Sequence, residues 1–427
     1  MTNISRHDCE QLDVADPLAP FRDKFVLPDS VIYLDGNSLG ALPKCTAQRV
    51  AQTLQDEWGH GLIRSWNAAG WMDAPQRIGD KIARLVGADA GEVIAADSTS
   101  VNLFKVLSAA LRIQTQHAAH RASHDSRTRS RKIILSEQEN FPTDLYMAQG
   151  LIAQLGNTHH LHLTNHELLL DAINDDTALV MLTHINYRTG RMHDMRAITA
   201  KAHAHGAWVI WDLAHSAGAL PVALNDCEAD FAVGCGYKYL NGGPGAPAFV
   251  FVAKRHQEKV QQPLTGWMGH AQPFAFDAQF APAAGIERML CGSPAMLSMT
   301  ALECGIDLWL EADLQAVRRK SLALSDLFMG LVAQRCEGFD LNLVTPRNHD
   351  ERGSQVSFTH TQGFAIMQAL IAAGVIGDFR APDILRFGFT PLYVRFVDVW
   401  DAVDRLQHIL QTEVWRNPMF QKRGKVT

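Results

Sequence analysis

The sequence lacks the features that mark secreted, membrane-spanning and nucleic-acid-binding proteins. Its seven cysteines are odd in number and form no CxxC pair. A disulfide framework, a structural zinc site or another bound metal is therefore not expected, and a reducing compartment fits best. The longest weakly polar run, residues 364–377, is too short to cross a bilayer, and residues 1–16 contain no apolar stretch of a secretory signal. A formal net charge of -6 indicates neither nucleic acid nor a membrane surface as a partner, and we expect a cytoplasmic protein.

The length and composition are those of a globular protein with more than one domain. The 427 residues are 47% hydrophobic and 20% charged, which is close to the average for globular proteins. A chain of this length exceeds what one core usually holds, so we expect a large domain and a smaller one. The predicted division is an N-terminal segment over residues 1–30, a large domain over 31–300, and a linker helix with a small C-terminal α+β domain over 301–427.

The middle of the chain alternates short apolar runs with helical patterns. Such alternation predicts βαβ units, and therefore an α/β fold with a mostly parallel sheet flanked by helices. A helix is predicted over residues 194–205, with Gly206 as its C-terminal stop. Because ligands bind beyond the carboxyl ends of strands in open α/β sheets, we expect the site at that edge. The predicted strands cover residues 178–183, 207–212, 230–235 and 248–252.

Three other regions have a different character. Residues 294–330 show one long helical pattern, and the chain beyond residue 340 mixes short strands with helices. Residues 112–132 hold five arginines and one lysine against a single aspartate. We interpret this basic segment as a solvated loop or hairpin tip in preference to a nucleic-acid patch.

Lys238 and Asp212 are the strongest candidates for chemistry. Lys238 stands among tyrosines and glycines directly after a predicted strand, and a lysine that attaches to an aldehyde must be partly desolvated to free its amine. Asp212 ends another predicted strand, and a buried carboxylate is costly unless it is paired. The protonated ring nitrogen of pyridoxal 5′-phosphate (PLP) is such a partner. The ordinary alternatives are a helix-capping aspartate and a surface lysine.

Consecutive hydroxyl groups indicate a place for a phosphate. Residues 98–100 are three hydroxyl side chains in a row at the start of a predicted helix. The N–H groups and hydroxyls of a helix N-terminus can bind an anion. Because N-capping explains one hydroxyl but hardly three, Thr99 and Ser100 are the phosphate candidates.

Four further side chains could complete a site. Phe141 could stack on the cofactor ring and Asp144 could bond its hydroxyl group, although residues 141–144 also fit a turn that leads into a helix. His215 could lie near the same ring or be a structural histidine. Arg386 lies among apolar residues on a predicted strand, and such an arginine usually has an anionic partner, either a substrate carboxylate or a structural carboxylate.

These motifs, together and in this order, resemble the kynureninase family of fold-type I PLP enzymes, which belong to the aspartate aminotransferase superfamily. The resemblance runs from end to end. Its most specific parts are Asp-Leu-Ala-His at 212–215, Tyr-Lys-Tyr-Leu-Asn at 237–241 and Gly-Trp-Met-Gly-His at 266–270. Further matching stretches are residues 33–40, 97–103, 141–144 and 291–294.

The resemblance implies a catalytic centre in the large domain. Lys238 would carry PLP and remove the Cα proton of the substrate, Asp212 would pair with the ring nitrogen, and Tyr237 would donate a proton to the cleaved carbon. The cofactor-binding residues that the resemblance implies are Thr99, Ser100, Phe141, Pro142, Thr143, Asp144, Thr183, Asp212, His215, Tyr237, Lys238, Trp267 and Ser293.

The resemblance also implies how substrate and subunits are arranged. Arg386 would hold the substrate carboxylate, and Ser38 and Trp66 would lie near its aromatic ring. The family forms homodimers with shared active sites, so Trp267 and Ser293 would reach in from a second subunit. The basic segment at 112–132 is similar to a peripheral insertion.

The implied reaction is hydrolytic Cβ–Cγ cleavage of L-kynurenine to anthranilate and L-alanine in tryptophan catabolism, a pathway also linked to NAD biosynthesis. The sequence leaves open a preference for 3-hydroxykynurenine, which would give 3-hydroxyanthranilate, and a biosynthetic instead of a degradative role. The alternative is another fold-type I PLP enzyme, such as a cysteine desulfurase-like lyase. That reaction needs a nucleophilic cysteine late in the chain, and Cys336 stands in no supporting motif. A non-catalytic scaffold is not favoured, because Lys238, Asp212 and Arg386 are all present.

Overall fold

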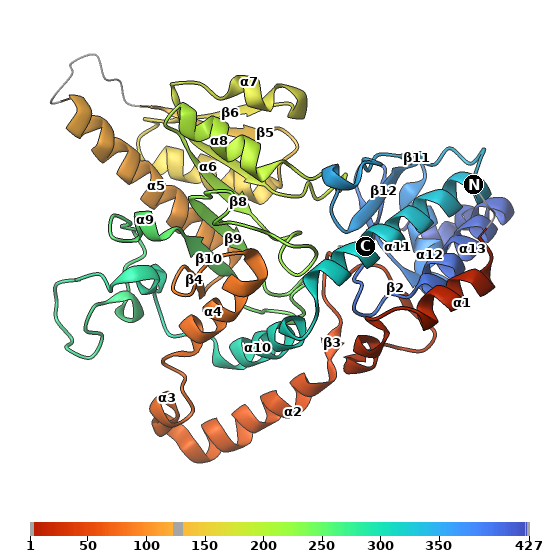
Figure 1. The fold of residues 1–427 in the computed structure, drawn as a ribbon, viewed down its shortest axis with the longest axis horizontal. Coiled ribbons are helices and arrows are strands. Elements are labelled where there is room, and N and C mark those ends of the chain that lie inside the picture. The colour runs from red at the N-terminus through yellow and green to blue at the C-terminus, as the bar shows by residue number, and fades with distance from the viewer. Residues whose placement is uncertain (1–3, 123–130, 423, 425–427) are drawn as a thin grey trace.

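The computed structural model describes residues 4–122, 131–422 and 424 (Figure 1). Its central element is a seven-stranded sheet in the order β4-β10-β9-β8-β7-β5-β6. The neighbours from β9 through β8, β7 and β5 to β6 pair in parallel, whereas β10 runs antiparallel to both β9 and β4. The predicted mostly parallel sheet is thereby confirmed. The strands are β4 (Val93–Ala95), β5 (Ile133–Glu137), β6 (His160–Thr164), β7 (Thr177–Thr183), β8 (Trp208–Asp212), β9 (Phe231–Gly234) and β10 (Phe249–Val252).

The sheet is buried on both faces because helices cover each side. Along β8, Val209 and Trp211 enter one hydrophobic cluster while Ile210 enters the other, as the alternation of side chains along a strand requires. This two-sided burial explains why the strands are nearly continuous apolar runs in the sequence. The helices of this region are α2 (Lys44–Gln52), α3 (Ser65–Ala68), α4 (Ala74–Val86), α5 (Thr99–Ala122), α6 (Pro142–Gln154), α7 (Leu169–Ala172), α8 (Met195–Ala204), α9 (Lys254–Gln257) and α10 (Met296–Leu310).

The C-terminal region forms a second, antiparallel sheet in the order β11-β12-β15-β14. This agrees with the predicted mixture of short strands and helices. The elements are α11 (Leu314–Arg335), β11 (Asn342–Leu343), β12 (Gln355–Thr359), α12 (Gly363–Ala372), β13 (Val375–Ile376), β14 (Asp378–Arg380), β15 (Ile384–Gly388) and α13 (Phe396–Thr412).

The single long helix expected over residues 294–330 is wrong in one respect. The chain forms two helices, α10 and α11, and the break falls at Asp313. Asp313 has an extended backbone and its carboxylate accepts a hydrogen bond from the N–H of Gln315. An aspartate that caps a new helix in this way ends the preceding helical pattern.

The N-terminal segment packs beside the C-terminal region (Figure 1). In α1 (Arg6–Val14), the carboxylate of Asp13 accepts hydrogen bonds from the first backbone N–H groups of α13. The short strand β2 (Ile32–Tyr33) pairs in parallel with β13, and β1 (Phe25–Val26) pairs with β3 (Leu42–Pro43). The divisions at residues 30 and 300 stay a prediction, and these contacts attach residues 6–33 to the C-terminal part.

The basic segment is only partly a loop. Helix α5 continues through Ala122, so the expectation of a loop is wrong for residues 112–122, which contain neither glycine nor proline to end the helix. Residues 123–130 lie outside the described part of the chain. Arg131 donates a hydrogen bond to the carbonyl oxygen of His205 at 2.9 Å. Among the helices that the structure describes, none has the length and hydropathy to span a membrane.

Candidate active site

Lys238 lies just beyond β9, at the carboxyl edge of the parallel strands. Its Nζ is 3.1 Å from Nε2 of His215. The amine also lies over the rings of Phe141 and Tyr237, with each ring centroid 5.8 Å away. Two aromatic rings and one imidazole therefore surround the amine.

Two buried carboxylates, Asp212 and Asp144, interact electrostatically with Lys238 and with one another. Asp212 ends β8 and stands opposite Thr183, the last residue of β7. Burial raises the pKa of Asp212, and the positive charge of Lys238 opposes the rise. Burial and the neighbouring Asp212 charge both raise the pKa of Asp144, again against Lys238. The structure thus gathers two acids around one amine.

The environment of these acids fits a cationic ring nitrogen and a ring hydroxyl group. One oxygen of Asp212 accepts a hydrogen bond from the N–H of Ala214 at 2.8 Å. The Oδ2 atom of Asp144 is buried and has no hydrogen-bond partner within the part of the chain described. Because a buried carboxylate oxygen without a donor is costly, these acids suit a bound group that brings its own donors. PLP has a protonatable ring nitrogen and a ring hydroxyl, and the residues present fit it.

A chain of hydrogen bonds leads from Lys238 to Arg386. Nδ1 of His215 lies 3.1 Å from Oε1 of Gln355, and Nε2 of Gln355 donates to the carbonyl oxygen of Tyr187 at 3.0 Å. A guanidinium nitrogen of Arg386 donates to the same carbonyl at 2.8 Å. Burial, and then the charges of Lys238 and Arg386, hold the pKa of His215 well below its usual range, so its ring is neutral.

Arg386 is 1% exposed and sits in the middle of β15. Its second terminal nitrogen donates to Oγ of Ser38 at 2.9 Å and forms an ion pair with Asp378. The ion pair with Asp378 gives Arg386 the structural carboxylate partner that was one of its two alternatives. The Nε of Arg386 remains a donor without an acceptor among the described residues.

The start of α5 carries the hydroxyl groups that the sequence analysis selected for a phosphate. Thr99 is the first helical residue, and both Thr99 and Ser100 are half-buried. Nζ of Lys105 contacts Asp97 and donates to the carbonyl oxygen of Met289 at 2.6 Å. This buried lysine therefore joins the loop before α5 to the segment that leads to Ser293.

Ser293 lies near this loop. It and Asp97 line the same cavity of about 240 Å³. Ser293 is exposed, so its hydroxyl is available to a neighbouring group.

Trp66 and Trp267 contact one another and, within the described residues, form no hydrogen bond or ring contact with Lys238. Trp66, on α3, contacts Trp267 in an edge-to-face arrangement with ring centroids 5.9 Å apart. Figure 1 shows α3 at the lower edge of the molecule, apart from β8 and β9.

Pro142 and Thr143 form the first turn of α6, next to Phe141 and Asp144, and are half-buried.

Several residues of the site escaped the sequence analysis. Gln355 and Tyr187 connect His215 to Arg386, and Asp378 pairs with that arginine. Asn140 accepts hydrogen bonds from the N–H groups of Phe141 and Thr183. Its position just before the Phe-Pro-Thr-Asp stretch is a signal that could have been used, whereas nothing local marks the others.

Both family models and full-length proteins are similar to this chain in sequence. The family model "Kynureninase C-terminal domain" matches residues 317–406, and the model of the DegT/DnrJ/EryC1/StrS aminotransferase family matches residues 158–221. A kynureninase from Burkholderia pseudomallei (strain 1106a) is 57% identical over 99% of this chain and 100% of its own length. A kynureninase from Pseudomonas fluorescens is 54% identical with the same coverage.

The solved structures that resemble the chain are more distant. A cysteine desulfurase from Thermococcus onnurineus NA1 has a TM-score of 0.75 at 18% identity, covering 92% of this chain and 98% of that one. A cysteine desulfurase from Escherichia coli has a TM-score of 0.73, also at 18% identity and with the same coverage. At this identity the likeness shows the fold alone, whereas the full-length relatives show the family. The chain belongs to the kynureninase family.

Proposed function

We propose that the chain is a PLP-dependent kynureninase that hydrolyses L-kynurenine to anthranilate and L-alanine, with Lys238 as the residue that attaches the cofactor. Membership of the family supports the reaction. One observation carries the assignment of residues. The amine of Lys238 interacts electrostatically with the buried carboxylates of Asp212 and Asp144, and a chain of hydrogen bonds links it to Arg386.

The cofactor would be held by residues at the carboxyl edge of the sheet. Asp212 would pair with the ring nitrogen, Asp144 would accept from the ring hydroxyl, and Phe141 would cover one ring face. When bound, PLP supplies an electron sink next to the substrate Cα. The hydroxyls of Thr99 and Ser100 and the free N–H groups at the start of α5 would bind the phosphate. The other proposed cofactor contacts are Pro142, Thr143, Thr183, His215, Tyr237, Trp267 and Ser293.

Lys238 and Tyr237 would move the protons. The neutral Lys238 amine would take the proton from the substrate Cα. His215 is buried and uncharged, so it can accept a hydrogen bond from Lys238 without competing as an acid. Burial raises the pKa of Tyr237 to about 12, which keeps its hydroxyl protonated at neutral pH. Tyr237 can therefore donate a proton to Cβ after anthranilate has left.

Arg386 would orient the substrate by its α-carboxylate. Its guanidinium is buried, and it is fixed by the Tyr187 carbonyl and by Ser38. A fixed, planar guanidinium binds a carboxylate at a defined angle. Ser38 and Trp66 would lie near the aromatic ring of the substrate.

A homodimer with shared sites would bring Trp66, Trp267 and Ser293 to the cofactor of a partner. In the single chain the rings of Trp66 and Trp267 contact one another, and α3, which carries Trp66, lies apart from β8 and β9 (Figure 1). Large apolar side chains are exposed in the same part of the chain, among them Ile63 at 77%, and such surfaces mark association sites.

Hybrid dimers test the shared site. Lys238→Ala and Trp267→Ala are made on separately tagged chains and combined. Each parent is inactive or weak, and the mixed dimer regains activity because one of its two sites has both native residues. No recovery in a verified mixed dimer contradicts the shared site.

The reaction is tested with the purified PLP-loaded protein and both substrates. Anthranilate fluorescence should rise with L-kynurenine, and the 3-hydroxykynurenine reaction, followed by its own product, measures the preference. The Lys238→Ala variant should lose the visible absorbance of the lysine-bound cofactor together with activity. If neither substrate gave any product, the result would contradict the proposed reaction. A role in tryptophan catabolism and NAD biosynthesis, in the cytoplasm, is proposed from the same reaction.

The cysteine desulfurase alternative lacks a suitable nucleophile. Cys336 is 3% exposed at the end of α11, and burial raises its pKa to about 11. A buried, protonated thiol cannot attack a substrate.

A further inference from the structure

Three side chains of the metal-ligating type converge at the carboxyl edge of the sheet, outside the proposed cofactor site. Glu137 is the last residue of β5, His166 follows β6, and His193 follows β7 beyond a short bridge. Because β5 pairs in parallel with both β6 and β7, the residues after these strands meet at one edge. One ligand atom of each side chain lies within 4.8 Å of those of the other two.

The distances within this cluster are close to those around a bound metal ion. Oε1 of Glu137 is 3.0 Å from Nδ1 of His166, and Oε2 is 3.1 Å from Nε2 of His193. A tetrahedral zinc site with bonds near 2.0–2.1 Å places neighbouring ligand atoms about 3.3 Å apart. Insertion of an ion therefore needs movements of only a few tenths of an ångström at these two contacts.

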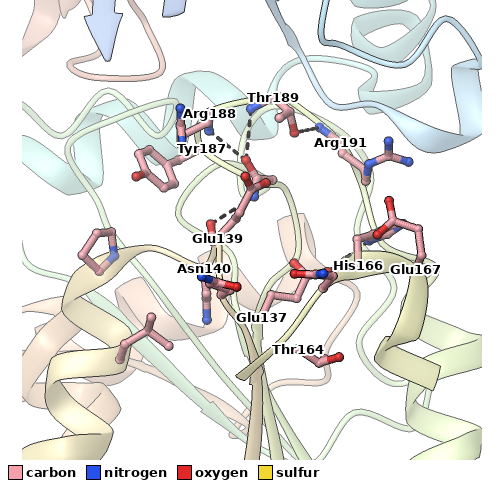
Figure 2. Close-up of a pocket in the computed structure, with 15 residues that line it drawn as sticks. Glu137, Glu139, Asn140, Thr164, His166, Glu167, Tyr187, Arg188, Thr189 and Arg191 are labelled. Carbon is pink, nitrogen blue, oxygen red and sulfur yellow. Dashed lines mark hydrogen bonds and ion pairs between the residues drawn. The ribbon is translucent and has the colours of Figure 1, made fainter. Parts of the chain in front are cut away.

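The cluster is buried on one side and open on the other. The side chains of Glu137 and His193 are 6% and 2% exposed, whereas His166 is 37% exposed. Glu137 and His166 line a cavity of about 590 Å³, in which Thr164 and Glu167 lie on the same side (Figure 2). The cavity supplies an entry path and room for a water or another ligand, as a metal site requires.

A second cluster, around Asp230, also combines a carboxylate with two imidazoles. There, further partners already compensate the charge of the carboxylate. Asp230 contacts Nε2 of both His203 and His256 at 2.8 Å. It also accepts a hydrogen bond from the N–H of Val209 and forms an ion pair with Arg255. The carboxylate of Glu137, by contrast, has no arginine, lysine or backbone N–H partner in the region that the structure describes. Within the described residues, its side-chain partners are His166 and His193.

We propose that Glu137, His166 and His193 bind one divalent transition-metal ion, with Zn²⁺ the best match and the fourth position facing the cavity. Two imidazoles and one carboxylate form a ligand set that zinc accepts. The site goes beyond the kynureninase activity and does not depend on it. It would tie together the ends of three strands next to Asn140, whose side chain holds the backbones of Phe141 and Thr183.

The test measures Zn²⁺ binding to the PLP-loaded protein. The protein is stripped with a chelator, its free cysteines are blocked, and zinc binding is measured by equilibrium dialysis with metal analysis. We expect one Zn²⁺ per chain and a higher melting temperature with zinc, since a ligand that binds only the folded state stabilises it. Co²⁺ should give the visible absorption of a four-coordinate nitrogen and oxygen site.

Variants in each cluster decide the location. His166→Gln and His193→Gln should each weaken zinc binding by at least about tenfold and abolish the rise in melting temperature. His203→Gln, in the Asp230 cluster, should keep both, and circular dichroism with PLP content shows that each variant is folded. Because His166 is partly exposed, its replacement does not open the core. Unchanged zinc binding in the folded His166→Gln variant, or no saturable binding to the unmodified protein, overturns the proposal.

Discussion

Gln355 orients the ring of His215 by presenting its side-chain oxygen as a hydrogen-bond acceptor. The amide nitrogen of Gln355 is used by the Tyr187 carbonyl, so its Oε1 faces Nδ1 of His215 at 3.1 Å. Nδ1 must then carry the proton and Nε2 must accept. Nε2 is the atom that lies 3.1 Å from Nζ of Lys238. A residue 117 positions beyond the lysine in the sequence therefore sets the hydrogen-bonding state of the group that faces it.

Replacing Gln355 by leucine should lower kcat/KM by about fivefold, the effect of losing a hydrogen bond worth about 1 kcal/mol. His215 loses its fixed tautomer, so its ring no longer presents Nε2 toward Nζ of Lys238. Steady-state kinetics with L-kynurenine measures the loss. Gln114→Leu is the control, because Gln114 is also buried and hydrogen-bonded but lies on α5. An unchanged kcat/KM in Gln355→Leu, or an equal loss in Gln114→Leu, argues against the orienting role.

Replacing Arg386 by lysine should lower kcat/KM by about 100-fold, mainly through KM. Lysine keeps the charge but cannot contact Tyr187, Ser38 and a substrate carboxylate at once. Steady-state kinetics with L-kynurenine measures the effect. Arg352→Lys is the control, since Arg352 is equally buried in an ion pair with Asp326. If both variants lost activity alike, the loss would reflect folding and not substrate binding.

The parts of the fold that the sequence predicted depend on local patterns. Strands β7 to β10 are apolar runs bounded by polar or glycine-rich segments, and Lys238 and Asp212 follow such runs directly. The break between α10 and α11 depends on a single cap at Asp313, which a helical periodicity does not reveal.

The contacts that complete the site could not be predicted, because they join distant parts of the chain. Gln355 meets His215 across 140 positions, and Ser38 meets Arg386 across 348. The family resemblance named Ser38 without its contact, and Gln355 had no signal at all. Such contacts follow from how the C-terminal sheet packs against the large one, which spacing in the sequence does not encode.

Asp35 should make the protein less stable as the pH rises. Burial, and then repulsion from Asp378, raise the pKa of Asp35 from 3.8 to about 7. Between these two values the folded protein keeps a proton that the unfolded chain has released. The stabilisation is therefore complete below about pH 4 and is lost as the pH rises through 7.

The variant Asp35→Asn cannot ionise, so the stability difference between it and the unmodified protein should depend on pH. We expect the variant to gain relative stability between pH 5 and pH 8, by at most about 3 kcal/mol. Urea unfolding of the PLP-loaded proteins at both pH values measures the difference. The exposed Asp56→Asn should show no such gain, and a parallel shift in both variants would contradict the buried titration of Asp35.

Lys105 should control the affinity for PLP without taking part in the reaction. Its amine is fully buried and connects Asp97 with the carbonyl oxygen of Met289. It thereby fixes the loop that leads into Thr99. In Lys105→Met the methylene volume is kept, but the charge and both contacts are lost, so the proposed phosphate groups are no longer held in place.

We therefore expect PLP to bind to Lys105→Met about 10- to 100-fold more weakly, which corresponds to about 1.4–2.8 kcal/mol, while kcat at saturating PLP stays within a factor of a few. Titration of the cofactor-free protein with PLP, followed by absorbance, gives the affinity. Lys81→Met is the control, because Lys81 pairs with Glu303 and Asp307 on the surface of α4. A loss of kcat with unchanged PLP affinity would instead place Lys105 in the chemical step, where nothing in its contacts puts it.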